Sequence, residues 1–177
     1  MDEKINMPSK KIIALLVVVV LIAPSFLINT DWEVSHQIEI EASPANVWRF
    51  LADLESYPEW NRYSPSVTGK LAVGEVVYVE AHLDQEVRQV QNFVLSIKPE
   101  QELCWQSGDW FAHLANGVRC RWLTPTEDGG TLLVHHEIMQ GPLAWLIERL
   151  YRPRIERGLA LVDTSLAEYA EKYQRQN

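Results

Sequence analysis

The sequence predicts an α+β domain in which an antiparallel sheet of about seven strands curls around one long C-terminal helix. Three observations predict this class. Residues 32–41 alternate between apolar and polar side chains, residues 67–139 form strand-like runs separated by turns, and residues 142–173 carry a helical apolar stripe. Successive strands joined by short turns pair antiparallel, and a lone amphipathic helix must bury its stripe against their sheet.

The first strand is predicted from strict alternation in Trp32–Glu41, which is typical of a strand with one buried face. A short helix follows, because Ser43 is a favourable N-cap and Pro44 suits the first helical position. The turn-rich segment after it predicts a second brief helix over residues 58–62. Two short helices are therefore expected after the first strand.

The remaining strands are predicted in pairs, with turns at residues 73–74, 99–100 and 128–130. The final helix is expected to begin at Pro142 and to end near Tyr173. Pro153 lies inside it. Because proline lacks a backbone donor and clashes with the preceding turn, we expect a kink or an interruption near Arg149.

An apolar segment of 17 residues, Ile12–Ile28, precedes the domain and contains no charge. This length is at the short end of what crosses a bilayer. Lys10 and Lys11 stand before it and acidic residues follow it, an asymmetry that places the N-terminus in the cytoplasm. The sequence predicts a membrane anchor with the following domain exported to the periplasm or the extracellular side.

A cleaved signal peptide is the competing interpretation, with residues 12–22 as its apolar region and residues 23–25 as the cleavage site. The apolar run resumes after that site, which favours retention. The chain then divides into a cytoplasmic tail (1–11), an anchor or uncleaved signal (12–28) and an exported domain (30–177). Both interpretations export the domain.

Composition narrows the functional classes. A formal net charge of -8 argues against binding nucleic acid, whose phosphates require a basic surface. The sequence has no phosphate-binding loop, dinucleotide motif, nucleophile elbow or Cys/His spacing for zinc, so neither a metal nor a cofactor is predicted. Export makes a disulfide between Cys104 and Cys120 feasible. Strand parity nevertheless places these cysteines on opposite faces, which disfavours the bond.

The order of elements and four stretches resemble the START-like, or SRPBCC, superfamily, which includes the polyketide cyclase/dehydrase-like proteins. The stretches are residues 38–61, the turn at 73–75, residues 129–143 and residues 157–171. The resemblance covers nearly everything after Asp31 and implies the helix-grip fold. It also implies a cavity between sheet and helix that takes lipids, sterols or polyketides. Some members are cyclases or dehydratases, and many bacterial members have an N-terminal hydrophobic segment.

Residues that would line such a cavity are predicted from strand and helix parity. They are Val79, Phe93, Leu95, Trp105, Trp122, Leu159 and Val162. The family's entrance loop corresponds to the segment that holds Trp60 and Tyr63, which are therefore expected at the cavity mouth. Each of these side chains also has a simpler interpretation as an ordinary core residue.

Three polar residues are candidates for proton transfer. His36 lies on the apolar face of the first strand, so it is expected to point inward and to need a hydrogen-bond partner. His135 and Glu137 share one face of the last strand, while His136 lies on the other, so the two adjacent histidines cannot chelate one metal. A satisfied core histidine and an outward-facing polar pair are the structural alternatives.

The leading functional prediction is a membrane-anchored domain that binds a hydrophobic small molecule or lipid. One alternative is a polyketide cyclase or dehydratase-like enzyme that uses His36, His135 or Glu137. A ligand-free interaction module with a filled core is the other. Four arginines, at positions 149, 152, 154 and 157, form either a solvated face or a contact with anionic lipid headgroups.

Overall fold

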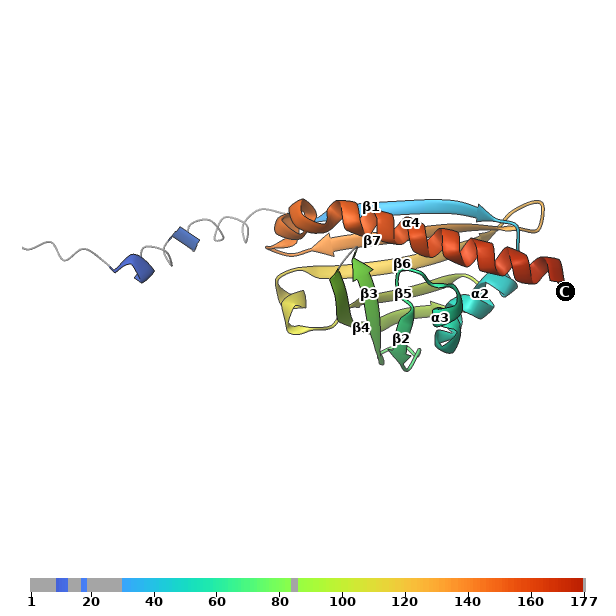
Figure 1. Cartoon of the computed structure of the whole chain (residues 1–177), viewed down its shortest axis with the longest axis horizontal. Helices are drawn as coiled ribbons and strands as arrows, with labels where there is room; N and C mark the ends of the chain where they lie inside the picture. Colours follow the sequence, from blue (N-terminus) through green and yellow to red (C-terminus); the bar gives the residue numbers. More distant parts are fainter. Residues whose placement is uncertain (1–8, 13–16, 19–29, 84–85, 177) are drawn as a thin grey trace, which may run out of the picture.

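The computed structural model describes residues 9–12, 17–18, 30–83 and 86–176. Within these residues the sheet has seven antiparallel strands in the order β1-β7-β6-β5-β4-β3-β2. The strands are β1 (Trp32–Ile40), β2 (Ser66–Gly69), β3 (Val76–Leu83), β4 (Glu86–Lys98), β5 (Glu102–Ser107), β6 (Asn116–Pro125) and β7 (Thr131–Gln140). The long helix α4 (Ala144–Gln176) lies along β1 and β7 on the inner side of the sheet (Figure 1). The predicted α+β helix-grip arrangement is confirmed.

Two short helices follow β1, as expected. The helix α2 (Pro44–Ala52) begins where the Ser43 side chain accepts a hydrogen bond from the Asn46 amide. The 3-10 turn η2 (Leu54–Ser56) leads into α3 (Tyr57–Trp60). A further 3-10 turn, η3 (Trp110–His113), connects β5 to β6. The described residues contain no helix that is long and apolar enough to cross a membrane, and most of the predicted anchor, Ile12–Ile28, lies outside them.

The core has two parts. The larger part joins α2, α3 and the second half of α4 to the sheet, and Leu51, Leu133 and Leu166 are among its fully buried residues. The smaller part surrounds Trp32 and Leu159 near the start of α4. The halves of the fold therefore differ in packing, and the space described below lies beside the smaller part.

The helix α4 runs through Pro153, so of the predicted kink or interruption near Arg149 the interruption does not occur. Arg152 forms ion pairs with Glu148 and Glu156, one turn before it and one turn after it. These pairs tie together the turns on both sides of the proline. Burial of Ile155 just beyond it adds packing that compensates for the lost backbone hydrogen bond.

The prediction against a disulfide was wrong. Cys104 on β5 and Cys120 on β6 are direct register partners with Cα atoms 4.2 Å apart, and they form a disulfide. The parity argument failed because it assigned the apolar residues of β6, including Cys120, to the inner face of the sheet. In fact Arg119, Arg121 and Leu123 point inward, and both cysteines lie on the outer face.

Candidate functional site

The candidate site is a cavity of about 180 Å³ at one end of the fold, between the sheet and the first half of α4. Antiparallel pairing brings together at this end the starts of β1, β4 and β6 and the ends of β3, β5 and β7. Small residues on these segments, Ala81, Ala115 and Gly117, leave the space unfilled. The cavity thus follows from strand register combined with small side chains.

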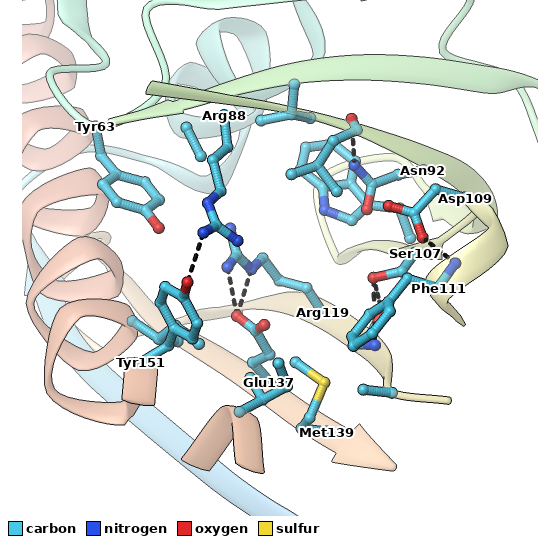
Figure 2. A pocket seen from close by; sticks show the side chains of 18 residues that line it. Tyr63, Arg88, Asn92, Ser107, Asp109, Phe111, Arg119, Glu137, Met139 and Tyr151 are labelled. Carbon is cyan, nitrogen blue, oxygen red and sulfur yellow. Dashed lines mark hydrogen bonds and ion pairs between the residues drawn. The ribbon is translucent and has the colours of Figure 1, made fainter. Parts of the chain in front are cut away.

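Most of the wall is apolar, and its polar side chains form two groups. The apolar lining residues are Val79, Ala81, Val90, Trp105, Phe111, Ala115, Met139, Ile147 and Ile155. Figure 2 shows one polar cluster near α4, made of Tyr63, Arg88, Arg119, Glu137 and Tyr151, while Asn92, Ser107 and Asp109 lie beside Phe111 on the side away from the helix. An apolar wall with a few convergent polar groups is the usual form of a small-molecule site.

Arg119 and Glu137 form the buried part of this polar cluster. They are register partners on β6 and β7, and Nε of Arg119 donates to Oε2 of Glu137 over 2.8 Å. A second donation from the same guanidinium makes the contact two-pronged. Burial by itself would lower the pKa of Arg119, but the charge of Glu137 and the Tyr63 side chain outweigh burial and raise it. The pair therefore presents a fixed, charged surface to the cavity.

Arg88 and Tyr151 mark where the cavity reaches solvent. The guanidinium of Arg88 donates to the Tyr151 hydroxyl and lies 4.7 Å from the centre of that ring. Arg88 comes from the exposed start of β4 and Tyr151 from α4, so their contact crosses the gap between sheet and helix (Figure 2). Asp109, another exposed lining residue, stands at the entry to η3. The cavity opens among these three elements.

A second buried polar cluster lies deeper and does not line the cavity. Asp163 of α4 accepts hydrogen bonds from Nδ1 of His135 at 2.7 Å and Nδ1 of His36 at 2.8 Å. Arg121 is 2% exposed and lies 4.7 Å from the centre of the Trp105 ring. Burial, together with the charge of Arg121, lowers the pKa of His135 to about 3 despite the opposing effect of Asp163. At neutral pH His135 is therefore an uncharged donor to Asp163.

Of the predicted site residues, the structure brings Tyr63, Val79, Trp105 and Glu137 together around the cavity. Leu159 and Val162 are buried in the two core clusters and do not line it. Trp60 is 4% exposed and packs in the larger core, next to Tyr57. His36 points inward as expected, and His135, whose direction the sequence left open, does so too, but both converge on Asp163 instead of on the cavity.

Three predicted wall residues face outward, contrary to expectation. Phe93 and Leu95 are 36% and 40% exposed, because a bulge between Val94 and Ser96 breaks the alternation of β4. The prediction placed every second residue of this strand on the inner face. The bulge shifts that alternation by one residue, so Phe93 and Leu95 were assigned to the wrong face. Trp122 stacks on His136 and donates to Glu102 on the outer face.

Several lining residues were missed by the sequence prediction: Arg88, Asn92, Ser107, Asp109, Phe111, Arg119, Met139 and Tyr151. For Arg119 the sequence contained a signal that could have predicted its position. The strand β6 contains the pattern R-x-R, and β7 contains the pattern H-x-E. A hairpin joins the two strands, and its register pairs Arg119 with Glu137 and Arg121 with His135. The opposite charges of Arg119 and Glu137 at one paired position indicate that these two side chains interact on one face of the hairpin. The described residues contain no group of three His, Cys, Asp or Glu side chains that could hold a metal.

Comparison with solved structures places this geometry among known folds. An aromatase/cyclase from Streptomyces superposes with a TM-score of 0.68 at 15% identity, covering 80% of this chain and 94% of that one. Norcoclaurine synthase from Thalictrum flavum, in complex with dopamine and hydroxybenzaldehyde, gives a TM-score of 0.66 at 9% identity, covering 97% and 98%. A protein of unknown function from Staphylococcus aureus gives 0.66 at 13%, covering 85% and 99%. These similarities show a shared fold.

Sequence comparison supplies the family. No curated protein is similar enough to match the chain. The model of the family described as polyketide cyclase/dehydrase and lipid transport matches residues 31–171, which span every strand of the sheet and most of α4. The chain belongs to the polyketide cyclase/dehydrase and lipid transport family.

Proposed function

We propose that this protein is a membrane-anchored domain that binds a small hydrophobic molecule carrying one polar group. The cavity carries this proposal. Its apolar wall would hold the body of the ligand, and the cluster of Tyr63, Arg119 and Glu137 would hold its polar group. The family description, and the small aromatic molecules named in the complex of norcoclaurine synthase, support a ligand of this kind.

The size of the cavity favours a compact ligand. Its volume of about 180 Å³ is below the roughly 300–1,000 Å³ typical of sites for drug-sized molecules. A one- or two-ring compound fits this space, whereas a complete lipid requires the cavity to widen. The Arg88–Tyr151 contact across the opening is where widening would begin.

Anchoring and export are supported by two independent features. The uncharged segment Ile12–Ile28 follows a pair of lysines and precedes acidic residues, which is the charge bias of an exported domain. The Cys104–Cys120 disulfide is the second, because disulfides persist in oxidising compartments outside the cytoplasm.

Binding alone is favoured over catalysis. The enzyme hypothesis needs a proton-transfer group in the cavity, yet His36 and His135 are both committed to Asp163 outside it. Glu137 lines the cavity, and one of its oxygens is engaged by Arg119. A filled interaction module is disfavoured by the cavity itself.

The direct test is fluorescence titration of the full chain with naphthol, a two-ring compound with one hydroxyl. Val90 lines the cavity, so Val90→Trp should fill it and weaken binding by about tenfold or more, equivalent to about 1.4 kcal/mol. Val73 is 62% exposed near the other end of the sheet, which makes Val73→Trp the matched control with unchanged affinity. Native mass spectrometry of the purified chain would then identify any bound compound.

Two results would contradict the proposal. One is a wild-type protein that binds neither naphthol nor any compound retained through purification. The other is equal affinity in the wild type and in a folded Val90→Trp variant, which would place the bound naphthol outside the cavity.

A further inference from the structure

The chain enters the domain beside the cavity. Thr30 donates through its hydroxyl to the Gly141 carbonyl over 2.7 Å, and the indole of Trp32 donates to the Ala144 carbonyl over 2.8 Å. Trp32 is also the register partner of Met139, which lines the cavity. The described domain therefore begins, at Thr30 and β1, at the end of the fold where the cavity lies.

Exposed apolar side chains gather on the elements that surround the opening. We name four of them the apolar rim: Val87 (60% exposed), Trp110 (77%), Trp145 (38%) and Leu150 (54%). Trp110 and Leu150 directly precede the lining residues Phe111 and Tyr151, and Val87 stands beside the lining residue Arg88 on β4, with its own side chain on the other face of the sheet. Several large apolar groups left exposed around one opening indicate a surface that contacts something apolar.

Trp110 is held in its exposed position by local structure. Asp109 caps η3 by accepting hydrogen bonds from the amides of Phe111 and Ala112. The indole of Trp110 packs edge-on against Phe111, with ring centres 5.6 Å apart and planes at 84°. The most exposed tryptophan therefore stands on a capped turn whose next residue forms the cavity wall.

The short connection to the predicted anchor limits where this end can lie. Ile28, the last residue of the uncharged segment, is four positions before Trp32. Four residues span at most roughly 14 Å when fully extended. If residues 12–28 cross the bilayer, as proposed above, the cavity end is held against the membrane surface. This step rests on the anchoring part of the proposed function.

We infer that the apolar rim inserts into the interfacial layer of the bilayer, so that the cavity opens toward the membrane and exchanges its ligand with it. Tryptophan suits this position, because its ring is apolar and its N–H reaches the polar headgroups. The opening of the cavity then faces the phase in which hydrophobic ligands concentrate.

The charges around the rim indicate that anionic lipid is not the main attraction. Arg152 is paired with Glu148 and Glu156, and Arg154 with Glu86. Arg88 also lies close to Glu86. Because these arginines are largely neutralised, insertion depends on the apolar side chains. Vesicles of phosphatidylcholine, which is zwitterionic and has no net charge, should therefore be sufficient, and added salt should have little effect.

The test uses the full chain reconstituted in phosphatidylcholine vesicles, with an environment-sensitive nitrobenzoxadiazole label on Trp110→Cys. The native cysteines are joined in the disulfide, so only the new thiol reacts. The label should emit at shorter wavelength than in water and be quenched by spin-labelled lipids. The same label on Val73→Cys, a site of similar exposure away from the cavity, should behave as in water.

Each other outcome overturns the inference. Water-like emission at position 110 means that the rim stays in solvent. Shifted emission that lipid quenchers do not reach, or that grows with protein density, means that a protein or a second copy covers it. If an alkaline wash releases the chain from the vesicles, the chain is not anchored, and both the anchoring part of the proposed function and this inference are refuted. Naphthol titration separates the proposed function from this inference. If naphthol binds while the label at position 110 emits as in water, only the inference is refuted.

Discussion

Asp163 and His135 join α4 to β7 through a fully buried hydrogen bond of 2.7 Å between Oδ1 and Nδ1. The other carboxylate oxygen accepts from His36 on β1. Burial acts to raise the pKa of Asp163, but its interactions with His135, Arg121 and His36 outweigh burial and lower it. One ionised carboxylate thus connects the helix to two neighbouring strands and balances the buried Arg121.

Replacing Asp163 by asparagine should destabilise the fold strongly. Asp163→Asn keeps the shape but removes the negative charge that acts on the buried Arg121, and leaving a buried charge uncompensated costs about 3–5 kcal/mol. Urea unfolding measures the loss. Glu168→Gln is the control, because Glu168 lies on the same helix in an exposed pair with Arg62 and should cost less than about 1 kcal/mol. Similar losses in both variants would contradict a special role for Asp163.

Stability should fall on mild acidification because of His135. Its pKa is about 3 in the folded protein and about 6.5 when unfolded. Below pH 6.5 the unfolded chain gains a proton that the folded protein does not take up. The free energy of unfolding should therefore decrease by up to about 1.4 kcal/mol per pH unit as pH falls from 6.5 toward 4. The contribution of Asp163 is lost only below about pH 4, since its pKa is lowered in the fold.

The control for this pH effect is His135→Gln, which cannot titrate. Urea unfolding between pH 7 and pH 4.5 should give a shallower slope for the variant, by about 1 kcal/mol per pH unit. Equal slopes would show that His135 is protonated in the folded protein.

The sequence was sufficient for the fold because alternation and turns are local signals. The alternation of β1, the cap at Ser43 and the hairpin at residues 128–130 each specify an element without knowledge of its neighbours. Their order then restricts the packing to a sheet around one helix. The continuity of α4 through Pro153 could not be predicted in this way, because it depends on packing and ion pairs around the proline.

The cavity was predicted only in part, because its position depends on the pairing of particular strands. Inward-facing Arg119 and Arg121 contradict the rule that the apolar face is the inner one, and only their partners on β7 and α4 make their burial tolerable. The bulge in β4 moved Asn92 inward and Phe93 outward. The open space itself comes from small residues on three different strands or turns, which no single stretch reveals.

The disulfide should make a measurable contribution to stability. Cys104 and Cys120 are 16 residues apart, and closing a loop of about 15 residues stabilises a fold by about 3 kcal/mol in the chain-entropy model. The double variant Cys104→Ala/Cys120→Ala should lose about that amount in urea unfolding, while naphthol affinity stays unchanged, because both residues lie on the outer face. Thiol titration of the unfolded, unreduced protein should find no free thiol. Two free thiols would contradict the bond.

Gly158 is where α4 makes room for Tyr63, so an alanine there should act on both stability and binding. A Cβ at this position would lie 2.5 Å from Cε2 and Cζ of the Tyr63 ring, which lines the cavity. Alanine gains about 1 kcal/mol in helix propensity, but overpacking against a buried ring costs about 1–3 kcal/mol. Gly158→Ala should therefore destabilise the protein and weaken naphthol binding. In a Tyr63→Ala background the clash is absent, so the same substitution should instead stabilise by about 1 kcal/mol. A double-mutant cycle in urea measures this reversal of sign, and stabilisation in both backgrounds would mean that the helix and Tyr63 are not in close contact.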